Sequence, residues 1–392
     1  MALTVETIRL PEGPYRQRLA WTTAVMTAAD GSEQRQSAGA TPRVYLSAAL
    51  SLSDAEIRAL RARQRATATA VAAYELPRVS DGVTTTADLS AGQSSVAVDG
   101  FGLAAWAVAG QRVAVIGPDG RGVRGEIVSV SDPDIDLDDT IPSGLALPAN
   151  LTRVYPLDPI LLDSAQAVER WPTNLSRWHI SGRCSSSSGW GGAGASVTTH
   201  DSLPVLPWRP LGDGSEAYPT GSVYVDAGFG AVASSTTWDD GQIQRGGSWL
   251  IRTPAERQAW RALLATLRGR WRPFLAPTWR PDLTLYEQPA GSATAIRVTE
   301  DYAGLWATSP SHTRLQLECA DGAVLYRTIS GTSSGSGYQQ LAISALPSTI
   351  PGGSIRAVSF LELVRLDADD VVIEYAGSHD GRIALRMITV PG

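Results

Sequence analysis

Residues 250–283 read LIRTPAERQAWRALLATLRGRWRPFLAPTWRPDL, and the fold prediction for the whole chain starts from this stretch. Thr253 with Glu256 three residues later is the reciprocal pattern that satisfies free amides at a helix start. From there, apolar residues recur with the 3.6-residue period of a helix, at Trp260, Leu263, Leu264, Leu267 and Trp271. The stretch predicts a short helix whose apolar face packs on a sheet, followed by an aromatic, proline-rich strand.

A weaker copy of this stretch lies 200 residues earlier, where residues 50–77 align with residues 250–277. Ser53 takes the place of Thr253 and again carries a glutamate three residues on, which predicts a second capping box and a second short helix. An internal repeat changes every later assignment of the fold, so it has to be recognised first. The alignment indicates a tandem duplication.

The order of elements after each helix repeats as well. Residues 112–144 give a strand, a Gly/Asp turn, a second strand and an Ile-Pro-Ser-Gly ending, and residues 314–353 give the same order. An apolar strand then follows in each copy, at 154–162 and at 358–366. Because helical periodicity is confined to two short stretches, the sequence predicts a mainly β protein with two short helices.

The repeat sets the expected domain boundaries, with a β domain in each copy interrupted by an inserted small β-barrel-like module. A Ser/Gly-rich segment separates the two copies and is expected to be a flexible linker. The expected bounds are 1–80 with 154–183 for the first β domain, 81–153 for its inserted module, 184–202 for the linker, 203–283 with 357–392 for the second β domain, and 284–356 for its inserted module.

Composition describes a folded protein that is large enough for more than one core: 392 residues, 43% of them hydrophobic and 18% charged. A net charge of -6 without a basic block argues against a dedicated nucleic-acid-binding surface. No basic-plus-apolar signal pattern precedes Thr4, and polar residues interrupt the apolar run 103–116, so we expect neither secretion nor membrane insertion. Cys184 and Cys319 are expected to be free thiols.

Two short motifs and the four histidines predict no chemistry. Gly120, Gly122 and Gly125 match G-x-G-x-x-G, but they lie between two strands and not ahead of a helix. Residues 331–335 match the serine-hydrolase pattern G-x-S-x-G, yet we expect them in a hairpin loop and not in a strand-to-helix turn. The histidines lack metal-ligand spacing, and no paired carboxylates stand out. We therefore expect no enzymatic activity and no cofactor.

An acidic run at residues 132–139 is the one metal-like feature. If the run is extended, Asp132, Asp134 and Asp136 lie on one face and the apolar residues between them on the other. Two explanations stay open: solvated charge that prevents an edge strand from pairing, or a bound cation. The sixth position of an EF-hand-like alignment is Leu137 and not glycine, so the spacing itself predicts no calcium site.

The chain contains twelve tryptophans, several of them around the linker and the second helix. Aromatic side chains can stack on sugars or bases, but tryptophan also dominates cores and subunit interfaces, and we favour core and interface here. The interface candidates are Trp208, Trp249, Trp271, Phe274 and Trp279.

Three segments of the second copy resemble a known family. Residues 271–283, WRPFLAPTWRPDL, and residues 360–366, FLELVRL, followed by residues 369–375, look like segments of minor tail proteins of long-tailed, siphovirus-type bacteriophages. The members concerned are distal-tail and baseplate-hub components. The resemblance implies a tail-tube-like β-sandwich or split barrel with one packed helix, which assembles as a ring around the tail channel.

The duplication and the resemblance together give a functional expectation. Two tube-like domains in one chain would let three chains present six similar faces, so we expect a trimeric hub ring in the virion tail tip, assembled in the host cytoplasm. Its partners would be the tail tube protein and other tip or fibre proteins, and the genome DNA would only pass through the channel. A hexameric distal-tail ring is the alternative within this class. A carbohydrate-binding adhesin or cell-wall hydrolase is the alternative from another class.

Overall fold

The computed structural model describes most of the chain: residues 4–28, 32–66, 73–100, 106–145, 147–163, 166–170, 175–185, 195–212, 214–219, 222–226, 228, 233–236, 241–307, 309–377 and 380–390. Strands account for 51% of the protein and helices for 11%, and the sheets are antiparallel. The predicted mainly β class is therefore confirmed. The described residues contain three α-helices where two were predicted. The additional helix, α4 (Ala303–Ala307), spans five residues, which is too short to show a helical period in the sequence.

The strands of the first half are β1 (Glu6–Thr7), β2 (Glu12–Ala20), β3 (Thr23–Thr27), β4 (Glu33–Ser37), β5 (Arg43–Ser53), β6 (Ala73–Pro77), β7 (Val83–Thr84), β8 (Ser95–Ala97), β9 (Arg112–Ile116), β10 (Arg121–Ser131), β11 (Asp134–Leu137), β12 (Arg153–Leu162), β13 (Ala167–Arg170) and β14 (Leu175–Cys184). The helices described in this half are α1 (Asp54–Ala66) and the 3-10 turn η1 (Val79–Asp81).

The strands of the second half are β15 (Thr199–His200), β16 (Leu203–Pro204), β17 (Ser215–Ala217), β18 (Ser222–Val225), β19 (Ala233–Thr236), β20 (Gln244–Ile251), β21 (Phe274–Pro277), β22 (Ala295–Val298), β23 (Arg314–Cys319), β24 (Val324–Gly335), β25 (Tyr338–Ile343), β26 (Ile355–Leu366), β27 (Asp370–Tyr375) and β28 (Gly381–Thr389). Its helices are α3 (Pro254–Leu267), α4 and the 3-10 turns η2 (Pro310–His312) and η3 (Pro351–Gly353).

Both predicted helices begin where the capping pattern placed them. At α3 the Glu256 amide donates to Thr253 Oγ1 at 3.1 Å, and the Glu256 carboxylate accepts from the Arg252 amide at 2.7 Å. At α1 the exchange is reciprocal, since the Ser53 amide donates to Glu56 Oε2 at 2.7 Å and the Glu56 amide donates to Ser53 Oγ at 3.3 Å. The predicted capping box at Ser53 is therefore confirmed, whereas at Thr253 the side-chain cap is present and the return bond goes to the Arg252 amide.

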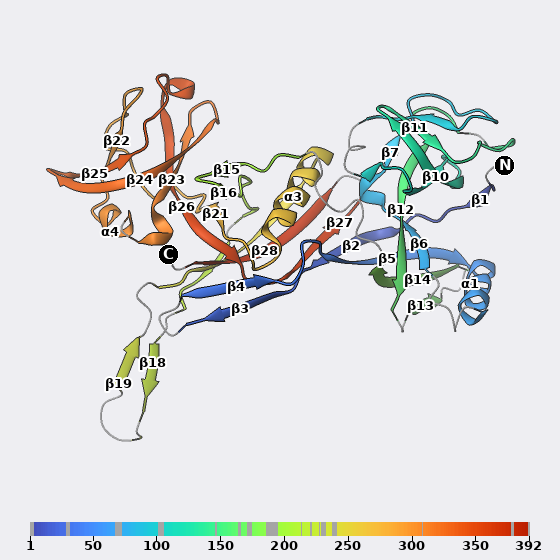
Figure 1. The fold of residues 1–392 in the computed structure, drawn as a ribbon, viewed down its shortest axis with the longest axis horizontal. Helices are drawn as coiled ribbons and strands as arrows, with labels where there is room; N and C mark the ends of the chain where they lie inside the picture. Colours follow the sequence, from blue (N-terminus) through green and yellow to red (C-terminus); the bar gives the residue numbers. More distant parts are fainter. Residues whose placement is uncertain are drawn as a thin grey trace.

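One antiparallel sheet runs along the long axis of the molecule, in the strand order β13–β14–β5–β2–β27–β28–β20–β17 (Figure 1). Its central pair, β2 with β27, joins the two ends of the chain, with Tyr15 opposite Tyr375 and Ala20 opposite Asp370. The two halves of the sequence therefore meet in a continuous sheet.

The main core lies on this sheet and includes residues from both halves. Tyr15 and Leu50 from the first half share one cluster with Trp249, Trp260 and Ile373 from the second half. Composition had indicated room for separate cores, but the β2–β27 pair brings the apolar faces of the two predicted β domains together, so they are buried jointly. Helix α3 covers this sheet near its middle, whereas α1 lies at its far end (Figure 1).

Two strand-rich modules stand at opposite ends of the long axis, each with its own cluster of buried apolar residues (Figure 1). One cluster runs from Val83 to Val154 and the other from Leu283 to Phe360. In the first module β8 pairs with β11, β11 with β10, and β10 with β9. In the second, β22 pairs with β25, β25 with β24, and β24 with β23.

The predicted linker 184–202 is narrower than the sequence suggested, because both of its ends belong to strands. Cys184 ends β14 and pairs with Ile160. At the other end, Thr199 and His200 form β15 and pair with β16. Residues 186–194, which contain most of the serine and glycine, lie outside the described part of the chain.

Candidate functional site

A buried cluster of charged side chains lies where the two halves meet. Arg78 precedes η1, Asp81 ends it, Asp158 is in β12, and Arg257 and Arg261 are on α3; each is at most 4% exposed. Arg78 Nη1 donates to Asp81 Oδ2 at 3.1 Å and Arg78 Nε donates to Asp158 Oδ2 at 2.8 Å. From the other half, Arg261 Nη1 donates to Asp81 Oδ2 at 2.8 Å and Arg257 Nε forms an ion pair with Asp81 Oδ1 at 2.9 Å.

Asp81 is the centre of this cluster, which we call the junction cluster. Burial by itself would raise the pKa of Asp81, but the guanidinium groups of Arg261, Arg257 and Arg78 outweigh burial and hold the pKa well below its usual range. A buried carboxylate is tolerated when partners compensate its lost hydration. Asp81 of one half is thus held ionised by two arginines of the other half, which fixes α3 against η1.

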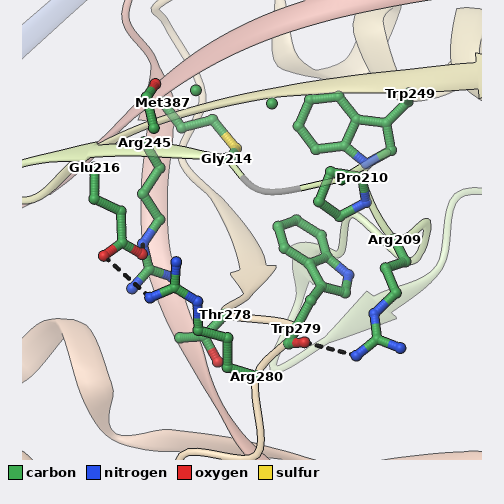
Figure 2. Close-up of a pocket in the computed structure, with 14 residues that line it drawn as sticks. Arg209, Pro210, Gly214, Glu216, Arg245, Trp249, Thr278, Trp279, Arg280 and Met387 are labelled. Atoms are coloured by element: carbon green, nitrogen blue, oxygen red, sulfur yellow. Dashed lines mark hydrogen bonds and ion pairs between the residues drawn. The ribbon is translucent and has the colours of Figure 1, made fainter.

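The second feature is a pocket beside β17 and β20, with a volume of about 350 Å³. Figure 2 shows the indoles of Trp249 and Trp279 with Pro210 on one side, and Glu216 with two guanidinium groups on the other. The lining residues are Arg209, Pro210, Gly212, Gly214, Ser215, Glu216, Arg245, Gly246, Gly247, Trp249, Thr278, Trp279, Arg280 and Met387.

The polar side of this pocket is internally paired. Glu216 forms ion pairs with Arg245 at 3.1 Å and with Arg280 at 3.3 Å. Arg245 also reaches the fully buried Glu362 at 2.8 Å. Arg209 Nη2 donates to the Trp279 carbonyl at 2.7 Å. Glu216 is the only carboxylate among the described residues that line the pocket, so the pair of acids that glycoside hydrolysis uses is not brought together there.

A Ser-His-Glu arrangement is connected to this pocket through the ion pair between Arg245 and Glu362, and no sequence motif predicted it. Ser311 Oγ lies 2.8 Å from His312 Nδ1, and His312 Nε2 lies 3.0 Å from Glu362 Oε1. All three side chains are at most 6% exposed, and the described pockets include none of them. A nucleophile must reach its substrate, so this arrangement is a buried polar network, in which His312 contacts Glu362 Oε1 and Arg245 forms an ion pair with Glu362 Oε2. Ser311 and His312 are adjacent in the sequence, but Glu362 lies 50 residues further on, which is why no local pattern pointed to the arrangement.

The five predicted interface residues divide by burial. Phe274 is 0% and Trp249 is 1% exposed, so both lie in the core of this chain and offer a partner no surface, which corrects the expectation for these two. Trp208, Trp271 and Trp279 are half-buried. Trp208 stacks on Trp260 of α3 with ring centroids 4.4 Å apart. Trp271 lies under the Arg268 guanidinium at 4.9 Å.

Trp279 keeps part of its indole at the pocket while the other part packs on the core. Its ring meets Trp249 edge to face at 5.9 Å, and its backbone has a φ of +55°. A positive φ is uncommon for a residue with a side chain, so the surrounding structure has to hold this conformation. Trp279 is the interface candidate with both a pocket position and a constrained backbone.

The acidic run follows the predicted alternation, and of its two open explanations the one as charge on an edge strand is wrong. Ile135 and Leu137 are buried, and the aspartates between them point away from the core. Strand β11 pairs with β10 on one side and with β8 on the other, so its charges do not protect an edge. Asp136 accepts a hydrogen bond from Ser129 Oγ at 2.5 Å. Within the described residues, Asp132, Asp134 and Asp136 do not form a group of three that could hold a metal ion.

The two discounted motifs both belong to β-hairpins. The predicted hairpin is present and Gly120 lies in its turn, but Gly122 and Gly125, which were expected between the two strands, belong to β10 and pair with β9. Residues 331–335 were expected in a hairpin loop, and this was wrong: they form the end of β24 and pair with β25, with Ser333 opposite Gln340. Backbone pairing there leaves no strand-to-helix turn of the kind that exposes a nucleophile.

No protein-family model matches the chain, and no curated protein is similar to it at a significant level. Among the described helices, none has the length and apolar character that a membrane crossing requires.

Proposed function

We propose that the chain is a tandem duplication of one β unit that carries an inserted β module, with the domain bounds expected from the sequence except at the linker, whose two ends belong to strands. The observation that carries the proposal is a matching set of strand pairs. In the first half β5 pairs with β14, β14 with β13 and with β12, and β12 with β6. In the second half β20 pairs with β28, β28 with β27 and with β26, and β26 with β21. These are the same pairs between elements in the same chain order.

The inserted modules support the duplication independently. The pairs β8–β11, β11–β10, β10–β9 and β9–β12 of the first module have counterparts in β22–β25, β25–β24, β24–β23 and β23–β26. The hairpin β3–β4 likewise has a counterpart in β18–β19. Two unrelated halves would have no reason to share so many non-local pairs, since each pair is specified by distant residues.

The duplicated β unit leads to the proposed role, a structural ring protein of a bacteriophage tail tip. Three chains with two similar units each would form a ring of six units, which suits a passage from a sixfold tube to a threefold tip. The protein would join the tail tube to tip or fibre proteins. Supporting this role are the duplicated β architecture, the packed helix α3 and the resemblance of residues 271–283 and 360–375 to minor tail proteins.

The first test is the mass of the purified full chain in solution by light scattering, followed by class averages of negatively stained particles. Rings of three chains with six lobes are expected, because two similar units per chain double the apparent symmetry. Rings of six chains would replace the hub by a distal-tail ring. Particles without cyclic symmetry at any concentration at which the protein stays dissolved would contradict a ring-forming role.

The pocket favours one candidate from another class, a carbohydrate-binding adhesin. An indole face beside guanidinium and carboxylate groups fits the apolar and polar faces of a sugar ring. Trp279, Arg280 and Glu216 supply these groups. Quenching of tryptophan fluorescence by cell-wall glycan fragments, lost in Trp279→Ala, would favour the adhesin. Unchanged tryptophan fluorescence at millimolar glycan would rule out the adhesin.

A further inference from the structure

Two strands at the ends of the long sheet have one partner each among the described residues. At one end β13 pairs with β14, and at the other end β17 pairs with β20. An unpaired strand edge presents a row of free amide and carbonyl groups, which is a template for another strand. The question is which strand each edge would accept.

The internal junction between the two halves answers this question. There, β2 of the first half pairs with β27 of the second half, antiparallel, with Arg16 opposite Glu374 and Arg18 opposite Val372. An ion pair of 2.8 Å between Arg16 and Glu374 adds to the backbone bonds. The β2–β27 pairing thus shows how the sheet of a first unit joins the sheet of a second unit.

The two free edges are the counterparts of the two strands in that junction. Strand β2 pairs with β5 as β17 pairs with β20. Strand β27 pairs with β28 as β13 pairs with β14. Within the sheet, β17 therefore occupies the position in the second half that β2 occupies in the first half. Likewise, β13 occupies the position in the first half that β27 occupies in the second half.

We propose that β17 of one copy pairs antiparallel with β13 of a second copy, repeating the β2–β27 junction between chains. The equivalent registers of the flanking strands set the pairing: Ser215 opposite Glu169, Glu216 opposite Val168, and Ala217 opposite Ala167. The last pair corresponds to Arg18 and Val372 of the internal junction. This inference rests on the proposed duplication, and it deepens the proposed ring by naming the strands that close it.

The burial of the two edges agrees with this register. At the internal junction, Gln17 and Ile373 face the core, while Arg18 and Val372 face outward. At the free edges Glu216 and Val168 are half-buried, whereas Ala217 and Ala167 are exposed. The faces therefore match residue by residue, as they must, because a slip of one residue would turn every side chain to the wrong face.

The contact is of the head-to-tail kind, since β17 and β13 are different surfaces of the same chain. Head-to-tail contacts form closed rings when the rotation from one copy to the next divides the circle, and filaments when it does not. The pocket beside β17 would lie at this contact, because Gly214, Ser215 and Glu216 line it. A ring would thus bring the second copy next to Trp279.

The test uses cysteines at the exposed alanine pair in the full-length chain. A167C protein is mixed with A217C protein and oxidised mildly, in parallel with a short bis-thiol cross-linker. Residues directly opposite in an antiparallel pair have Cβ atoms about 4.5–5.5 Å apart, within reach of both treatments. The natural cysteines, Cys184 and Cys319, are 7% and 0% exposed, and the unmodified protein measures their background.

The expected result is a covalent dimer in the mixture, with at least tenfold less dimer from either variant alone, because the contact is head-to-tail. The test includes a positive and a negative control. R18C/V372C places the same pair at the internal junction and should close within one chain. A217C mixed with V168C is displaced by one residue onto the opposite face and should cross-link poorly.

Two results would overturn the edge pairing: no dimer in the A167C and A217C mixture while R18C/V372C closes, or equal cross-linking with V168C. The proposed ring is judged separately by mass. Rings of defined mass without the cross-link would leave the ring standing and reject these strands as its contact. A monomer without the cross-link would reject both.

Discussion

Replacement of Asp81 by asparagine tests the junction cluster most directly. The carboxylate lies 3.1 Å from Arg78, 2.9 Å from Arg257 and 2.8 Å from Arg261, and all four side chains are buried. The amide of D81N keeps the shape of the side chain but removes the charge that the three guanidinium groups share. Removing one partner from a buried ion pair destabilises a protein by about 3–5 kcal/mol, and we expect a loss in that range.

The assay is urea unfolding of the full-length chain, followed by tryptophan fluorescence and by circular dichroism. With a slope of about 3 kcal/mol per molar urea, the expected loss lowers the midpoint by roughly 1–2 M. The matched control is D370N, since Asp370 pairs with Arg18 at 3.7 Å across the same junction, with side chains 52% and 45% exposed. An exposed pair contributes about 0.2–1 kcal/mol, so its midpoint should move by a few tenths molar at most.

The pH dependence adds a second readout with a defined sign. Because the folded-state pKa of Asp81 is depressed, its contribution to stability is fully present above the unfolded-state pKa, about 3.9 for aspartate, and is lost as the pH falls through the folded-state value. The difference between wild type and D81N should therefore be constant from pH 7 to pH 5. It should shrink only below about pH 4.

A D81N midpoint within about 0.3 M of the D370N midpoint would refute the argument, because burial would then not be amplifying the charge interactions. So would a wild-type advantage that already fades between pH 7 and pH 5. That result would mean that the pKa of Asp81 is raised and that burial outweighs the arginines.

Two further predictions concern α3 and are checked by the same urea unfolding. Trp260 is 0% exposed, and its ring centroid lies 4.4 Å from that of Trp208 and 5.9 Å from that of Trp249. W260A should therefore lower the free energy of unfolding by about 3–5 kcal/mol. The control L151A, at a side chain that is 61% exposed, should change it by less than about 0.5 kcal/mol. Equal effects would mean that the aromatic cluster is not part of the cooperative core. T253A removes the acceptor of the Glu256 amide and should lower the free energy of unfolding by about 1 kcal/mol. T253S keeps an acceptor, so its free energy of unfolding should stay within about 0.3 kcal/mol of wild type. A T253A protein as stable as wild type would show that the cap is dispensable.

The features that the sequence predicted correctly are those whose cause is local. The helix starts at Ser53 and Thr253 follow from side chains three residues apart. The apolar face of α3 from Trp260 to Leu267 follows from spacing along one helix, although Trp271, which continues the same spacing, lies beyond the end of the helix. The alternation in β11 follows from the pleat of one strand. Helix α4 was missed because five residues hold too little of the helical period to be recognised.

The errors concern features that depend on a partner distant in the sequence. Phe274 and Trp249 belong to the same residue type as an interface aromatic, and only the packing of α3 on the sheet makes them core. Residues 331–335 have the composition of a loop, and pairing with β25 turns them into a strand. The edge role of the acidic run failed for the same reason, since β8 and β10 flank β11.

The sequence by itself determined the mainly β class, two of the three described helices and where those two begin, because hydrogen bonds and periodicity within a few residues decide them. Only the tertiary structure decided that β2 pairs with β27, that both halves share one core, and that Asp81 is held by Arg257 and Arg261. These contacts join residues far apart in the chain. Their partners are selected by shape, burial and charge in the folded molecule, and spacing along the sequence carries no record of that selection.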